Sequence, residues 1–420
     1  MKRILMLTVA MGLMVSLAHA ADDPSAPIRI QPHPGAGKFK AKHDPDKPIL
    51  GFYGGIGLYQ RPNGQWTGYG QRSEDSVRYL INRLAGSGIT KAYVNFQEED
   101  YPSEIGPSSP PGAPDYIKLF CELAHQNNIE VYGHIACFAT NEISKCREFA
   151  AAHPEMFTRS IDGTPHPYML SPAYPEVRWI KRALLMEYVQ NYPVDGLALD
   201  FIRYPTYVIG YGNFGYDEPA LKRFREQYGY DESYVPAVDD PRWLRLKADY
   251  VTQFIREVRA DMEASGVSSL PVGAFNYSSH QSVSPYQLIH QDALTWEEEG
   301  LINEHMPMIV MTGGMSTLVK QTSELLRISR PDSTFLGPIF LAEWPTPEQG
   351  GTGDPTPEAV RDAARRLIKL GCDGLWFCRA EEIERFNLWP VVKEISQWSI
   401  SQIRAEDFDP FYENLLADGS

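Results

Sequence analysis

Residues 194–205 read VDGLALDFIRYP, and this stretch decides the fold class. Residues 196–199 form a short apolar run of the kind that builds a buried strand. The run ends abruptly in Asp200, and Arg203 and Tyr204 follow it. Polar groups directly after an apolar strand are typical of the C-terminal rim of a parallel α/β barrel, where the loops that follow the strands form the site. Asp200 is therefore the first candidate for a catalytic group.

Other segments share this strand-like character, and helix-like segments separate them. The expected strands are 49–54, 91–96, 130–137, 196–201, 271–275, 302–311, 334–340 and 374–378. The expected helices are 73–85, 114–127, 176–190, 219–228, 242–264, 286–299, 317–330 and 356–370. Eight strands alternating with helices predict an α/β fold, a (β/α)8 TIM barrel, and the long segments after the strands predict elaborated loops at its C-terminal rim. An open doubly wound sheet is the alternative, but GFYGGIG at 51–57 lacks the glycine pattern of a dinucleotide site.

The chain divides into four parts. Residues 1–20 combine Lys2 and Arg3, an apolar run and the small-x-small end Ala18-His19-Ala20, which predicts a secretory signal peptide and an exported protein, periplasmic or extracellular. Residues 21–47 are rich in Pro, Gly, Lys and Asp and are expected to be a flexible leader. Residues 48–400 form the expected barrel, and residues 401–420 a C-terminal tail. No later segment reaches the length of a membrane span.

Composition limits the partners. The formal net charge of −15 argues against nucleic acid and favours neutral or cationic substrates. The chain has 23 Tyr and 8 Trp, and rings at loop positions would suit stacking on sugars. The five cysteines include no CxxC pair and the ten histidines no HExxH motif, so we expect neither a disulfide framework nor a metal site. Nothing in the sequence demands a cofactor.

Carboxylates after strands are the candidates for chemistry. Cleavage of a glycosidic bond needs an acid that protonates the leaving oxygen and a second carboxylate that acts as nucleophile or base. Asp200 is predicted to be the nucleophile or base, and Glu343, after the seventh expected strand, the acid. Arg203 would hold Asp200 ionised, although the two could also form a purely structural pair. The acidic residues at 98–100 are interpreted as a solvated charge run, those at 381–384 as the start of a helix, and Glu304 and His305 as the opposite rim.

Polar and aromatic side chains near the strand ends are the predicted substrate contacts. They are Asn95, Gln97, His134, Arg203, Tyr204, Tyr277, Trp344 and Trp376. Amides and hydroxyls can hydrogen-bond to sugar hydroxyls, and the aromatic rings can stack on sugar faces. Core packing or local capping remains the alternative for the amide, the histidine and the aromatic rings.

The stretch 195–205 resembles the D-G-[IL]-x-[LF]-D-[YF]-[IF]-R-[YF]-P signature of the glycosyl-hydrolase-like ten family, which includes the divisome-associated peptidoglycan glycosidase of enteric bacteria. Weaker collinear matches are VNFQ at 94–97, YPSE at 101–104, LSPAYPEVR at 170–178, FGYD at 214–217 and RW at 242–243. The resemblance covers roughly residues 48–400. It implies a (β/α)8 barrel that hydrolyses glycosidic bonds, with Asp200 as a catalytic carboxylate and Arg203 and Tyr204 beside it.

Two departures from the family pattern bear on the substrate. Acidic residues at 98–100 stand where the family usually has a basic residue, and Ala198 stands where it usually has His or Gln. An acidic rim would favour amino sugars or deacetylated glycans. The sequence therefore predicts an exported glycoside hydrolase that acts on a cell-wall or environmental polysaccharide. A glycan-binding barrel without catalysis is the alternative, and a metal-dependent hydrolase lacks the expected ligand spacing.

Overall fold

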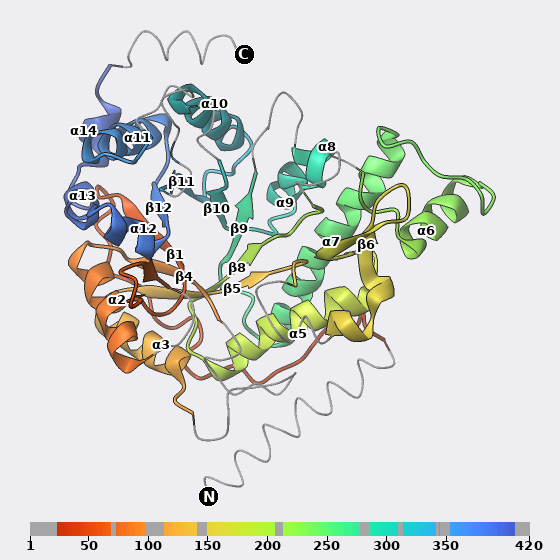
Figure 1. The fold of residues 1–420 in the computed structure, drawn as a ribbon, viewed down its shortest axis with the longest axis horizontal. Helices are drawn as coiled ribbons and strands as arrows, with labels where there is room; N and C mark the ends of the chain where they lie inside the picture. Colours follow the sequence, from red (N-terminus) through yellow and green to blue (C-terminus); the bar gives the residue numbers. More distant parts are fainter. Residues whose placement is uncertain are drawn as a thin grey trace, which may run out of the picture.

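A closed barrel of parallel strands forms the centre of the molecule (Figure 1). The computed structural model describes residues 23–68, 73–96, 113–140, 149–205, 213–277, 285–309, 314–341, 344 and 353–407. The barrel strands are β1 (Ile49–Gly54), β4 (Lys91–Asn95), β5 (Glu130–Ala136), β8 (Gly196–Asp200), β9 (Val272–Asn276), β10 (Glu304–Pro307), β11 (Thr334–Phe340) and β12 (Gly374–Cys378). The barrel closes where β1 pairs with both β4 and β12. The predicted barrel is confirmed, although β10 is shorter than the expected strand.

Helices follow the strands and surround the barrel (Figure 1). They are α2 (Glu74–Gly86), α3 (Tyr116–Gln126), α5 (Pro175–Asn191), α6 (Glu218–Tyr228), α7 (Pro241–Ala264), α8 (Pro285–Ile289), α9 (Ala293–Glu298), α10 (Gly314–Leu326), α11 (Pro357–Leu370), α12 (Ala380–Arg385), α13 (Trp389–Ile395) and α14 (Ile400–Arg404). The single helix expected over 286–299 was wrong: His290, at φ 61°, separates α8 from α9. A left-handed residue cannot continue a right-handed helix. Within the described ranges, none of these helices is both long and apolar enough to cross a bilayer.

Alternate side chains of the strands fill the barrel interior. The Phe275 ring lies at its centre, 6.0 Å from the Tyr93 ring and 5.1 Å from the Trp376 ring. The intervening residues, such as Phe52 and Val94, are also fully buried, because they belong to the core shared with the helices. Burial on both faces explains why the strands read as nearly continuous apolar runs.

Gly374 is a position where the barrel tolerates no side chain. It pairs with Ile49 across β1 and β12, and a Cβ there would lie 1.8 Å from the Ile49 carbonyl oxygen. We expect Gly374→Ala to lower the free energy of unfolding by about 1–3 kcal/mol, the usual cost of overpacking. Gly86→Ala, at the end of α2 with no atom within 4 Å, should be neutral or slightly stabilising. Urea titration of both variants measures the difference in their free energies of unfolding. Equal stability of the two variants would show that the pairing of β1 with β12 tolerates a side chain at Gly374.

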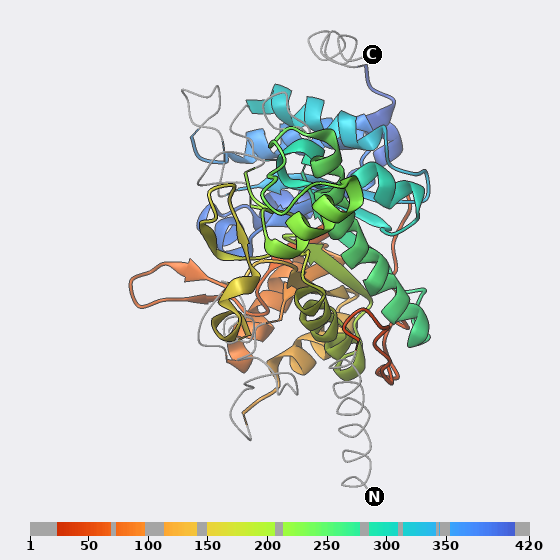
Figure 2. The same ribbon diagram turned by 90° about the vertical axis from the view of Figure 1, so that its right-hand side faces the viewer.

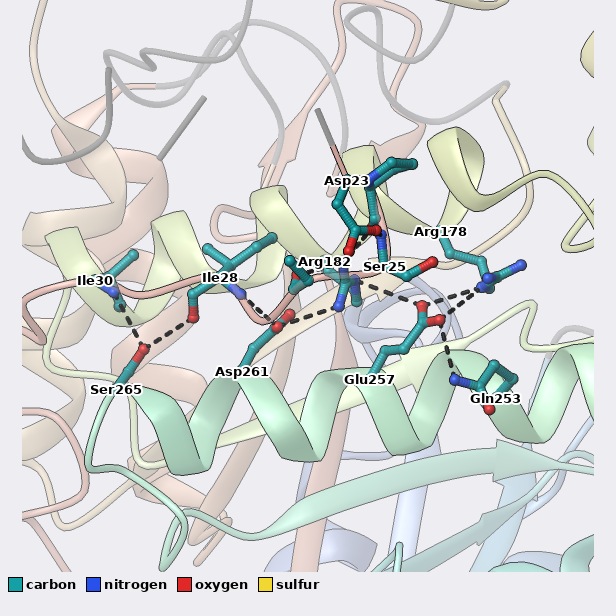
Figure 3. Close-up of polar contacts among 12 residues, drawn as sticks. Asp23, Ser25, Ile28, Ile30, Arg178, Arg182, Gln253, Glu257, Asp261 and Ser265 are labelled. Carbon is teal, nitrogen blue, oxygen red and sulfur yellow. Dashed lines mark hydrogen bonds and ion pairs between the residues drawn. The ribbon is translucent and has the colours of Figure 1, made fainter. Parts of the chain in front are cut away.

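The N-terminal segment, residues 23–47, is the described part of the segment expected as a leader, and it packs against the barrel and its helices. Figure 3 shows its first part lying across α5 and α7. Ile28 is 5% exposed, and its backbone N–H donates to Asp261 Oδ1 of α7 at 2.8 Å. Arg182 of α5 donates to the carbonyl oxygen of Pro24 at 2.8 Å. Carboxylate and guanidinium groups of the helices thus satisfy the polar backbone of a segment that has few apolar side chains.

The rest of the N-terminal segment continues along the N-terminal end of the barrel. The N–H of Gly37 donates to the Val194 carbonyl at 2.8 Å, directly before β8, and the N–H of Ala41 donates to Glu130 Oε1 at 3.0 Å, at the start of β5. The segment therefore forms part of the folded barrel unit.

The opposite, C-terminal rim carries two small hairpins. The first, β2 (Tyr59–Gln60) with β3 (Trp66–Thr67), follows β1. The second, β6 (Phe157–Arg159) with β7 (Pro165–Leu170), lies in the connection after β5. Figure 2 shows the orange and yellow hairpins on one side of the molecule and the red N-terminal segment on the other. Insertions after strands enlarge the rim at which Asp200 lies.

Candidate active site at the C-terminal rim

Asp200 is the last residue of β8, and its carboxylate is buried at the C-terminal rim. The residue is 3% exposed, and its Oδ1 accepts a hydrogen bond from the Phe201 N–H at 2.6 Å. Phe201 has φ 48°, so the chain turns sharply directly after the strand. A carboxylate fixed by the backbone of a tight turn is well placed to act on a group bound above the barrel.

His134 on β5 is the side chain that contacts Asp200. Its Nε2 lies 3.3 Å from Asp200 Oδ2, and the imidazole is fully buried. The Tyr53 ring lies 4.9 Å away, edge to face, and fixes the imidazole plane from β1. Among the described residues, His134 Nδ1 has no hydrogen-bond partner. The structure thus places His134 beside Asp200, while its contact with a substrate stays a prediction.

Arg203 lies at the rim but does not pair with Asp200 among the described residues. Its guanidinium lies over the Phe201 ring at 4.7 Å and over the Tyr277 ring at 5.2 Å. Its Nη1 donates to the Tyr204 carbonyl at 3.3 Å. The turn at Phe201 thus places the guanidinium over two aromatic rings, an arrangement that is favourable for a cation.

Tyr204 does not join the contacts of Asp200. Its ring packs edge to face on His290 at 5.1 Å. Burial and the nearby Asp217 carboxylate raise the pKa of its hydroxyl well above the ordinary value. The side chain belongs to a polar core beside α7, so the prediction of a substrate contact for Tyr204 has no support in this arrangement.

The remaining predicted contacts divide between rim and core. Asn95 ends β4 directly beside His134 in the ladder and is buried. Tyr277 follows β9 and is half-buried beneath Arg203. Trp376 is 1% exposed in the barrel interior, 4.9 Å from the Phe340 ring, so packing and not sugar stacking is its role here. Trp344 is also buried.

Gln97 and Glu343, the predicted substrate amide and the predicted acid, lie outside the described residues. The acidic run at 98–100 also lies outside them, and so does Cys146. The other cysteines are free and buried, as expected for Cys137 and Cys378. In the described ranges, no three His, Cys, Asp or Glu side chains form a group that could hold a metal ion.

Two rim residues were missed by the sequence argument. Tyr53, the penultimate residue of β1, contacts both His134 and, at 6.3 Å, Trp376. Tyr53 lies near the C-terminal end of the strand expected at 49–54, and this position could have indicated a residue of the rim. Glu381, a carboxylate after the eighth expected strand that was interpreted mostly as part of a helix start, is the second residue of α12, and it is 9% exposed. Burial raises the pKa of its carboxyl above the ordinary value.

The N-terminal end of the barrel contains a cavity of about 360 Å³, and an ion pair lies in its lining. Lys91 pairs with Glu304, which also accepts from the Tyr93 hydroxyl at 2.7 Å. Burial alone would raise the pKa of Glu304, but Lys91 and the tyrosine hydroxyls outweigh it and lower the pKa. Lys91 and the two tyrosines fully engage the Glu304 carboxylate at the N-terminal end of the barrel, where a structural role is typical.

Solved structures with this fold include several glycosidases. The chain is similar to the PgaB (BpsB) glycoside hydrolase domain from Bordetella bronchiseptica, at 14% identity and a TM-score of 0.59, over 83% of this chain and 99% of that one. It is also similar to the catalytic domain of β-amylase from Paenibacillus polymyxa, at 10% identity and a TM-score of 0.57, over 84% and 99%. An α-L-fucosidase isoenzyme 2 from Paenibacillus thiaminolyticus matches at 15% identity and a TM-score of 0.56, over 83% of this chain and 49% of that one. At these identities the likeness establishes the barrel fold alone.

Family membership follows from the sequence itself. No curated protein matches the chain. The model of the family described as Glycosyl hydrolase-like 10 matches residues 99–329, more than half of the chain, including β8 and Asp200. The chain belongs to the Glycosyl hydrolase-like 10 family.

Proposed function

We propose that this chain is a glycoside hydrolase that cleaves O-glycosidic bonds of a cell-wall or environmental polysaccharide at the C-terminal rim. The observation that carries the proposal is Asp200: a buried carboxylate at the end of β8, in contact with His134 and held by the Phe201 N–H. A fixed, ionised carboxylate can attack the anomeric carbon or take a proton from the attacking water. Family membership and the glycosidase neighbours agree with this chemistry.

The second carboxylate is also part of the proposal. The sequence predicts Glu343 for the acid, and the described rim offers another buried carboxyl, Glu381. Asn95 and the Arg203–Tyr277 stack line the same end of the barrel and are proposed to contact sugar hydroxyls and faces. The signal peptide expected at 1–20 supports action outside the cytoplasm, in the periplasm or beyond the cell.

The net charge of −15 supports amino sugars or deacetylated glycans as substrates. Purified protein should be incubated with chitin oligosaccharides, their deacetylated counterparts, peptidoglycan and neutral oligosaccharides, and the products analysed by mass spectrometry. We expect shortened glycans, formed fastest from the deacetylated series. Equal rates on charged and neutral sugars would remove the amino-sugar preference while leaving the hydrolase.

A glycan-binding barrel without catalysis is the second candidate, and the departures from the family pattern at 98–100 and Ala198 favour it. Binding of one of these glycans by the wild type, with no product after prolonged incubation, would establish it.

A further inference from the structure

Glu381 is a buried carboxyl group at the C-terminal end of the barrel without a full set of partners. It lies in the first turn of α12, which begins directly after β12 and Arg379. The residue is 9% exposed, and its Oε2 has no hydrogen-bond partner among the described residues. A buried carboxyl oxygen that nothing satisfies is costly, so its retention calls for an explanation beyond packing.

The surroundings of Glu381 belong to the same rim as Asp200. α12 packs on β1 and on β3 of the first rim hairpin. Glu381 Oε2 lies 3.2 Å from the point that a Cβ on Gly68 would occupy. The Gly57 carbonyl and the Gly55 N–H, both directly after β1, surround that point at 3.4 and 3.7 Å. The absence of a side chain at Gly68 thus leaves space beside the free oxygen.

Cys378 ends β12 three residues before Glu381, at the same rim of the barrel as Asp200. It is the last residue of that strand and lies in the interior cluster with Tyr53 and Trp376. Burial raises the pKa of its thiol to about 12, and the charges of both Glu381 and Asp200 contribute to the rise. Cys378 also pairs with Tyr53 in the ladder between β1 and β12, and the Tyr53 ring lies 4.9 Å from the His134 imidazole that contacts Asp200.

The environments of the two carboxylates differ in the way that acid and base require. Asp200 accepts a backbone N–H and lies beside the His134 imidazole. Glu381 has burial as its dominant influence, which favours the protonated form. Pairs of carboxyl groups in such unlike environments are typical of acid and nucleophile or base.

We propose that Glu381 is the proton donor of the glycosidase, acting with Asp200 on the same glycosidic bond; this rests on the function proposed above. As the bond between the anomeric carbon and the leaving oxygen breaks, the Glu381 O–H transfers its proton to that oxygen. Asp200 forms the new bond to the anomeric carbon, or takes a proton from the water that does so. In the first case a water then displaces Asp200 from the anomeric carbon and gives its proton to the Glu381 carboxylate. In the second case Asp200 releases its proton to solvent, and Glu381 regains one from solvent.

The test compares Glu381→Gln with Glu382→Gln, its neighbour on the same helix turn. Glu382 pairs with Arg385 at 3.4 Å at the surface, so it is a matched control. Each variant is assayed on the oligosaccharide that the wild type hydrolyses best and on the 2,4-dinitrophenyl glycoside of the same sugar, whose leaving group needs no proton. For Glu381→Gln we expect kcat/KM to fall about 10²–10⁴-fold on the oligosaccharide and less than about tenfold on the aryl glycoside. The alkaline limb of the pH profile should disappear, while Glu382→Gln behaves as wild type.

Several outcomes would overturn the proposal. Equal losses on both substrates would assign Glu381 to structure, and full activity on the oligosaccharide would exclude it from the chemistry. Activity on the oligosaccharide could be lost selectively in Glu343→Gln and not in Glu381→Gln. That result would make Glu343 the proton donor. A wild type that hydrolyses neither substrate refutes the proposed function itself, a result distinct from each of these.

Discussion

Asp200→Asn is expected to lower kcat by about 10³–10⁴-fold, the upper part of the range for a positioned acid or base. Asparagine has nearly the same shape, and its side-chain oxygen can still accept from the Phe201 N–H. It lacks the negative charge that a nucleophile or base needs, so turnover is lost while the site keeps its form. Kinetics on the best oligosaccharide measure the loss, and calorimetric titration with the same oligosaccharide should give a Kd close to that of the wild type.

Asp362→Asn provides the control for this variant. Asp362 lies on the outer face of α11, where its carboxylate pairs with Arg366 at 2.9 Å and is half-exposed. We expect its kcat to match that of the wild type. Unchanged kcat in Asp200→Asn would remove Asp200 from the mechanism, and loss of binding as well as turnover would mean that the substitution disrupts the site.

Arg182→Met is expected to lower the free energy of unfolding by about 3–5 kcal/mol, as is usual when one member of a buried ion network is removed. The Arg182 and Asp261 side chains are fully buried and 3.2 Å apart. Glu257 lies 3.7 Å from Arg182 and also pairs with Arg178 (Figure 3). Methionine fills much of the space, but it leaves two buried carboxylates with one guanidinium and removes the donor to the Pro24 carbonyl.

The same substitution should release the start of the N-terminal segment from α5 and α7. Limited proteolysis is expected to cut residues 23–30 faster in Arg182→Met than in wild type. Arg78→Met, which breaks an exposed pair with Glu74 on α2, should change stability by less than about 0.5 kcal/mol. Stabilities of Arg182→Met and Arg78→Met that agree in a urea titration would contradict the role given to the network.

The barrel could be predicted because its signals are local. The apolar run before Asp200 and the glycine or proline boundaries of the other segments each lie within a few residues, and eight such strands admit few arrangements. The packing of the N-terminal segment could not be predicted from the sequence, because it depends on partners more than 150 residues away. Asp261, for example, accepts the hydrogen bond from the Ile28 N–H. Composition alone describes such a segment as loose.

The site was predictable only where strand alternation applies. Asp200 and His134 occupy inward positions near strand ends, and the structure brings them together. Arg203 and Tyr204 follow the turn at Phe201, where strand alternation no longer fixes the direction of a side chain. Arg203 stacks on aromatic rings, and Tyr204 points into the core. Glu381 was missed because an acidic residue in a first helix turn has an ordinary explanation, and only its burial shows that the explanation is incomplete.

Hydrolysis at Asp200 transfers an oxygen atom from water to the product, so the fate of solvent oxygen reports on it. Wild type and Asp200→Asn are incubated with the best oligosaccharide in ¹⁸O-labelled water, and the products are analysed by mass spectrometry. We expect the wild type to yield shortened glycans with one heavy oxygen at each new reducing end, and Asp200→Asn to yield almost none. Labelled products formed by Asp200→Asn at the wild-type rate would contradict hydrolysis at Asp200.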